Sequence, residues 1–162
     1  KLMQISEDSL YFDEDRETCA LPADSVWSDL EQADRLARAV SFFVAGQTRL
    51  APQAGSETAD TRPLKLTLFA FGVAEEMMRL AGIGTPEEQV AQVVYVSLLV
   101  GGEQVDALKM TAEARSQRSN PQLNLFSLYG RTAVQMLVRE EEDTMQMFAR
   151  ALGENNDLRH AN

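Results

Sequence analysis

Hydrophobic residues recur every three or four positions along most of the chain, which is the spacing of one face of an α-helix. The most regular stripe predicts a long helix over about 24–50 and consists of Leu30, Ala33, Ala37, Val40 and Val44. Four more helices are predicted over 64–81, 86–100, 103–118 and 121–152. Since the acidic run 139–143 is expected to bend or divide the last helix, we predict an all-α protein, a single-domain bundle of five or six helices.

The segment 86–100 is apolar nearly all round, so we expect it to be the central helix of the core. Thr85 and Glu88 have the spacing of a capping box, with Pro86 as the first helical residue. Asn120 and Pro121 repeat the cap-then-proline order, and Gly153 is expected to stop the last helix. The many β-branched residues of 90–100 leave a buried strand open as the alternative.

Three regions follow from this pattern. Residues 1–22 have no helical period and form an irregular acidic N-terminal segment closed by Pro22. Residues 23–153 form the helical bundle domain, and 154–162 are expected to be a frayed C-terminal tail.

Charge is distributed very unevenly along the 162 residues, whose net charge is −10. Residues 1–34 hold ten acidic and two basic residues, and residues 35–162 hold fifteen acidic and thirteen basic ones. Such a chain gains no bulk attraction to nucleic acid phosphates or to an anionic membrane surface, so neither is an expected partner. A basic protein would be attracted.

The N-terminus gives a prediction about location. It lacks the apolar stretch of a secretory signal, so we interpret Lys1-Leu2 as a remnant of cloning and Met3 as the natural start. The chain is then expected to be cytoplasmic. A mature chain whose signal was removed is the alternative. Twelve arginines against three lysines suggest a GC-rich, bacterial genome.

The sequence contains few residues that could form a catalytic site. One cysteine, Cys19, and one histidine, His160, exclude a Cys/His zinc site, a Ser-His-Asp triad and a histidine-activated cysteine. No cofactor is therefore expected. Carboxylate clusters at 75–76, 87–88 and 140–143 leave one enzymatic alternative, a divalent-metal enzyme acting on a phosphorylated small molecule, with Glu75, Glu76 and Glu141 as the carboxylates to test.

Two regions are candidates for partner binding. Acids alternate with apolar side chains in the N-terminal segment, a composition found in segments that fold on binding, and the candidates there are Leu10, Tyr11, Phe12, Asp13, Glu14 and Asp15. Met145 and Phe148 follow an acidic run and are expected to leave apolar surface for a partner. A solvated tail and ordinary core packing are the respective alternatives.

These observations favour a non-enzymatic protein–protein interaction module, of the adaptor, inhibitor, immunity-protein or secretion-chaperone type, that engages a basic protein partner. The metal enzyme is one alternative and an acidic mimic of DNA is another. Because 90–100 is apolar on every side, we also expect a symmetric homodimer.

Overall fold

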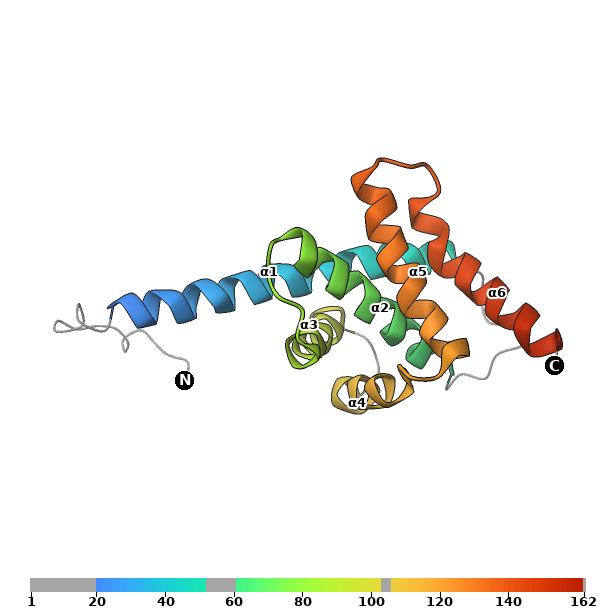
Figure 1. Cartoon of the computed structure of the whole chain (residues 1–162), viewed down its shortest axis with the longest axis horizontal. Coiled ribbons are helices and arrows are strands. Elements are labelled where there is room, and N and C mark those ends of the chain that lie inside the picture. The colour runs from blue at the N-terminus through green and yellow to red at the C-terminus, as the bar shows by residue number, and fades with distance from the viewer. Residues whose placement is uncertain (1–19, 52–60, 103–105, 162) are drawn as a thin grey trace. The chain divides into compact units, whose positions relative to one another are not determined.

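The computed structural model of the chain describes residues 20–51, 61–102 and 106–161 (Figure 1). Within these ranges 84% of the residues are helical and there is no strand, which confirms the all-α prediction and makes the strand alternative for 90–100 wrong. The helices are α1 (Ala20–Leu50), α2 (Thr61–Leu80), α3 (Glu87–Val100), α4 (Ala107–Gln117), α5 (Pro121–Val138), a 3-10 turn η2 (Thr144–Gln146) and α6 (Met147–Ala161).

The long first helix begins earlier than its stripe predicts, at Ala20 instead of about residue 24. Pro22 therefore lies inside the first turn of α1 and does not close the preceding segment. A proline is tolerated there because the first turn of a helix has no intrahelical acceptors for its N–H groups.

The chain divides between α5 and α6, as the acidic run predicts, and the two helices form an antiparallel pair (Figure 1). The predicted stop at Gly153 is wrong, because α6 continues through it to Ala161. Asn155, two residues later, is buried and its Nδ2 donates to the carbonyl oxygen of Gln122 at 3.3 Å. This contact with α5 holds the helix beyond the glycine.

The sequence predicts a capping residue directly before a proline at the start of two helices, α3 and α5. The structure confirms the cap of α5 but not that of α3. Asn120 caps α5 as expected, since its side chain accepts a hydrogen bond from the backbone N–H of Gln122 at 3.1 Å. The capping box at Thr85 and Glu88 is wrong. Pro86 is extended (φ −61°, ψ 141°) and is itself the N-cap of α3, without a side-chain cap hydrogen bond.

The centre of the bundle is α2, and the prediction that 86–100 is central is wrong. Eleven of the residues of α2 are buried, among them the complete run Thr67–Ala74. α3 buries one side only and leaves Leu99 55% exposed. The α2 helix can be covered from several sides because small residues alternate with phenylalanines in its middle.

α2 and α5 pack most closely, and they cross at two glycines. A Cβ atom on Gly72 would lie 1.8 Å from the carbonyl oxygen of Ser127, and one on Gly130 would lie 2.2 Å from that of Phe69. Ser127 Oγ also donates to the carbonyl oxygen of Leu68 at 2.9 Å. The two backbones are therefore in direct contact, which only glycine permits at these positions.

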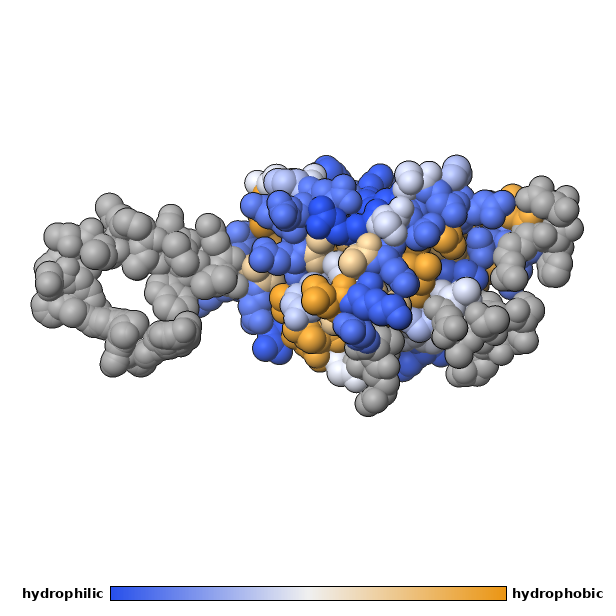
Figure 2. Space-filling model, turned by 90° about the horizontal axis from the view of Figure 1, so that it is seen from below, coloured by the Kyte–Doolittle hydropathy of each residue, from blue (hydrophilic) through white to orange (hydrophobic). Residues whose placement is uncertain are grey.

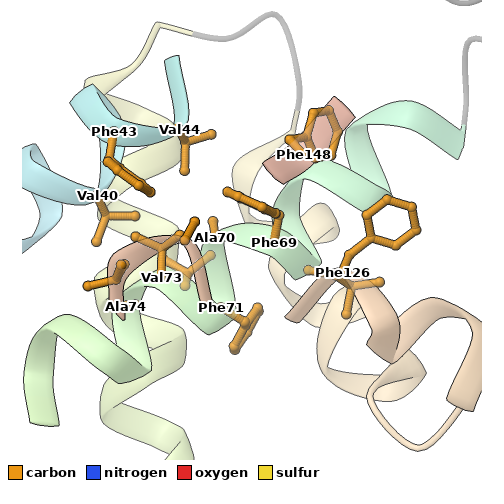
Figure 3. Close-up of a cluster of buried hydrophobic side chains, with 14 of the residues drawn as sticks. Val40, Phe43, Val44, Phe69, Ala70, Phe71, Val73, Ala74, Phe126 and Phe148 are labelled. Carbon is orange, nitrogen blue, oxygen red and sulfur yellow. The ribbon is translucent and has the colours of Figure 1, made fainter. Parts of the chain in front are cut away.

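Aromatic rings from three helices fill the core beside this crossing. Phe69 and Phe148 meet edge to face with their ring centroids 5.4 Å apart, and Phe126 lies 5.9 Å from Phe148. Figure 3 shows these rings next to a second group, in which Val40 and Phe43 of α1 lie against the middle of α2. One continuous core thus extends from the second half of α1 to α6.

Candidate functional site

Glu75 on α2 is one of the carboxylates that the sequence offers as a metal ligand. Its Oε2 accepts from Arg118 at 2.8 Å and its Oε1 from Arg131 at 2.7 Å, so both oxygens are paired with arginines outside α2. The Arg118 guanidinium also stacks 5.1 Å from the centroid of the Phe71 ring. Glu75 therefore joins α2 to the end of α4 and to α5.

Glu76, the next residue, is almost completely buried, with 2% of its side chain exposed. It accepts hydrogen bonds from Arg79, one turn later on α2. The hydrogen bond from Arg79 is the main reason that the pKa of this carboxyl lies below its usual value of 4.5, and burial works in the opposite direction. Glu76 is thus a negative charge held at neutral pH.

The other predicted carboxylate clusters are also engaged by arginines. Glu141 Oε2 lies 2.6 Å from Arg139 Nε, and Glu87 Oε2 lies 3.7 Å from Arg115. Across the residues that the structure describes, no three His, Cys, Asp or Glu side chains are grouped so that they could hold a metal ion. Glu75, Glu76, Glu87 and Glu141 therefore act as ion-pair partners of arginines.

A buried amide, Gln47, links α1 to the C-terminal helices. Its side chain has no exposed surface, its Nε2 donates to the carbonyl oxygen of Thr144 at 2.7 Å, and its Oε1 accepts from the backbone N–H of Phe148 at 3.0 Å. Because both polar atoms are satisfied, Gln47 is a structural contact. It occupies a core position of the α1 stripe, and a polar residue at that spacing is the signal that sequence reasoning missed.

The predicted partner-binding residues fall into two groups. Leu10 to Asp15 lie outside the described residues. Of the other two, Phe148 is fully buried between Phe69 and Phe126, so the expectation that it leaves exposed apolar surface is wrong. Met145 is half-buried, and its Cε reaches the surface of Gly46 on α1, where a Cβ would be 2.3 Å away. Both side chains pack within the chain because η2 turns the start of α6 onto α1.

Large apolar side chains are instead exposed at other places. Figure 2 shows a largely hydrophilic described surface on which hydrophobic residues form separate patches. Phe42 on α1 and Leu108 on α4 are the most exposed, and α3 ends in Leu99 and Val100. Leu108 lines a shallow, open depression of about 570 Å³ along α4, with Arg115 and Glu87 at its rim. None of these places brings together the acids, bases and nucleophiles of a catalytic centre.

The charge partition of the sequence coincides with a structural division. The contacts of the chain divide it into two units, Lys1–Asp34 and Arg35–Asn162. The first unit carries the ten acidic and two basic residues counted above, and the second is close to neutral. The boundary falls inside α1, between Asp34 and Arg35.

Comparisons with protein-family models, with curated proteins and with solved structures find no match to this chain. Of the described helices, none has the length and apolar character needed to cross a membrane. The class that the fold defines is therefore an all-α helical bundle whose charge excess lies in its N-terminal unit.

Proposed function

We propose that this chain is a non-enzymatic protein-binding module, of the adaptor, inhibitor, immunity-protein or secretion-chaperone type, and that its partner is basic. The observation that carries the proposal is the separation of charge between Lys1–Asp34 and the near-neutral remainder. A concentrated negative charge raises the rate at which a basic surface is encountered, and repels acidic competitors.

The ion pairs that Glu75 and Glu76 make with arginines favour a binding role over the metal-enzyme alternative. Glu75 and Glu76 would have to release Arg118, Arg131 and Arg79 before they could take a cation. Such a release would break the ion pairs by which Glu75 joins α2 to the end of α4 and to α5.

The test starts from co-purification in the native host with the full chain as bait. Two bait variants carry the same change in charge. One replaces Asp13, Glu14 and Asp15 by their amides, and the matched control does the same to Glu140, Glu141 and Glu142, which are exposed on the helical unit. We expect a basic protein that the wild type and the control retain and the segment variant loses.

The same partner then allows the two contributions to be separated kinetically. Neutralising Asp13, Glu14 and Asp15 should slow association and flatten its salt dependence, because long-range attraction is screened over about 10 Å at 0.1 M salt. Replacing Tyr11 and Phe12 with alanine should speed dissociation and leave the salt slope unchanged. The proposal would be contradicted if the retained protein were acidic. Equal binding of that protein by the two charge variants would also contradict it.

A further inference from the structure

The solvent-facing side of α4 carries one large apolar side chain followed by two small ones. Leu108, Ala112 and Ser116 follow one another at intervals of four residues, so they lie on one face of the helix, and all three are exposed. We name these three residues the α4 face. Leu108 is 69% exposed, more than any other leucine that the structure describes. The three buried residues of α4 lie on the other side of the helix and attach it to the bundle.

The α4 face contains both a projection and a depression. Leu108 projects at one end, and the small side chains of Ala112 and Ser116 leave room along the rest of the helix. The open depression of about 570 Å³ is lined by all three residues of the face. A surface with both features can fit a second copy of itself, because a two-fold axis brings the projection of each copy to the depression of the other.

The charges on the two flanks of the α4 face differ in how they are paired. On the flank that faces α3, Arg115 pairs with Glu87 at 3.7 Å. On the other flank, Lys109 and Glu113 are exposed, and neither makes an ion pair in the part of the chain that the structure describes. A lysine four residues before a glutamate is the less favourable order for a pair within one helix. This flank therefore presents one cation and one anion to solvent.

Both features match in a single register when two α4 helices lie antiparallel across a two-fold axis. Such an axis brings each flank beside the same flank of the other copy, so Lys109 of each copy can lie opposite Glu113 of the other. In that register, at a rise of about 1.5 Å per residue, Leu108 lies halfway between Ala112 and Ser116 of the second copy. Two ion pairs form, and each leucine enters a depression.

We propose that the α4 face is the docking surface for a second copy of this chain. Charge identifies the occupant: a basic helix would pair with Glu113 but oppose Lys109, and an acidic helix would do the reverse. A second copy satisfies both groups at once. The inference is separate from the basic partner proposed above, since α4 belongs to the near-neutral unit Arg35–Asn162.

The end of α3 enlarges this interface. α3 and α4 pack side by side, and six residues join Val100 to Ala107 (Figure 1). Because the axis brings like flanks together, the α3 helices of the two copies lie on the same side of the α4 pair. The exposed Leu99 and Val100 add apolar surface there. Two short helices from each copy make a small interface, so we expect a dimer with an affinity in the micromolar range.

Charge reversal on the flank tests the pairing across the axis. Lys109→Glu and Glu113→Lys change the net charge in opposite directions, so bulk repulsion alone would shift the dimer dissociation constant in opposite directions. Pairing predicts that each single reversal raises this constant by about threefold to tenfold. The double variant Lys109→Glu/Glu113→Lys should return it to near the wild-type value. Sedimentation of the full chain at about 0.15 M salt measures all four proteins.

Removal of the projecting leucine tests the apolar contact. Leu108→Ala should weaken dimerisation by about tenfold or more, because each dimer loses two leucine side chains from its interface. Leu128→Ala, at an exposed leucine of α5, is the matched control and should leave the dissociation constant unchanged. Far-UV circular dichroism checks that both variants keep the helical content of the wild type, which we expect because both side chains are exposed.

Three results would overturn the α4 docking surface. One is a wild-type mass near 18.0 kDa at every concentration. Another is a shift of the dissociation constant in opposite directions by the two single reversals, and the third is an equal effect of Leu108→Ala and Leu128→Ala. A dimer that Leu99→Glu dissociates and the α4 variants do not would also overturn it and place the interface at the end of α3 alone. Co-purification with the Asp13, Glu14 and Asp15 variant decides the proposed function separately.

Discussion

Single charges inside the bundle have measurable consequences, and Glu76 is the clearest case. Its pKa in the folded chain lies below the usual 4.5, mainly because Arg79 donates hydrogen bonds to the carboxylate. Between the folded and the unfolded pKa values, the unfolded chain binds more protons than the folded one. The stabilisation is therefore complete above about pH 4.5 and is lost as the pH falls through the folded value.

The Glu76→Gln variant tests this sign. At pH 7 it should unfold more readily than the wild type, by on the order of 1 kcal/mol, because the amide carries no charge for Arg79 to pair with. The difference should shrink as the pH is lowered below about 4.5. Denaturant unfolding at several pH values measures it, with Glu113→Gln, an exposed residue of α4, as the control. A difference that does not depend on pH would contradict the role of the Glu76 charge.

Some residues could be assigned from the sequence and others could not, for physical reasons. Ala37, Val40 and Val44 were predictable as core because their helical spacing repeats. Phe148 was misplaced because the direction in which α6 leaves η2 depends on contacts from α1, which lies about a hundred residues away. The burial of Gln47 could not be predicted because it depends on Thr144, a partner about a hundred residues away that no local pattern indicates. Glu76 was a candidate carboxylate from the sequence, but its burial was not predicted.

At the scale of the elements, the sequence was least able to predict which helix lies at the centre of the bundle. α3 has the higher apolar content, yet α2 is central even though it carries Lys65 and Glu76 at buried positions. Hydrophobic content predicts that a helix will bury a face, but not how many neighbours will cover it. That number depends on how closely the neighbours can approach, and in α2 glycine and alanine allow the closest approach.

The crossing of α2 and α5 gives a prediction at this scale. Gly72→Ala should destabilise the fold by about 2 kcal/mol or more, since the added methyl group would collide with the backbone of Ser127 and force the helices apart. Gly153→Ala is the matched control, because it lies within α6 with no atom near its Cβ position. The control should be neutral or more stable by up to about 1 kcal/mol, from helix propensity alone.

Thermal or denaturant unfolding of the two variants measures the difference between them. Since the same substitution is made in a helix each time, any common change in propensity cancels. Equal stability of Gly72→Ala and Gly153→Ala would mean that α2 and α5 do not approach each other as closely as the structure indicates. Gly130→Ala examines the same contact from α5.

At the scale of the whole molecule, the near-neutral helical unit and the acidic unit have different consequences for association. The uncharged run Gln89–Gly102 contains Leu99 and Val100 at the end of α3, and both side chains are exposed. A two-fold axis brings the same surface of each copy together, so an uncharged apolar strip can meet itself without repulsion. The acidic unit opposes self-association at low salt and does so less as salt screens it.

We therefore predict a homodimer through the end of α3, of about twice the 18.0 kDa chain mass, that becomes tighter between 0.05 and 0.5 M salt. Leu99→Glu should make the protein monomeric, because it would oppose two carboxylates across the axis. Leu128→Glu, at a similarly exposed leucine of α5, should leave the dimer intact. Light scattering across a range of concentrations distinguishes these outcomes. A wild-type mass near 18 kDa at every concentration would reject the dimer, and loss of the dimer in Leu128→Glu alone would move the interface from α3 to α5.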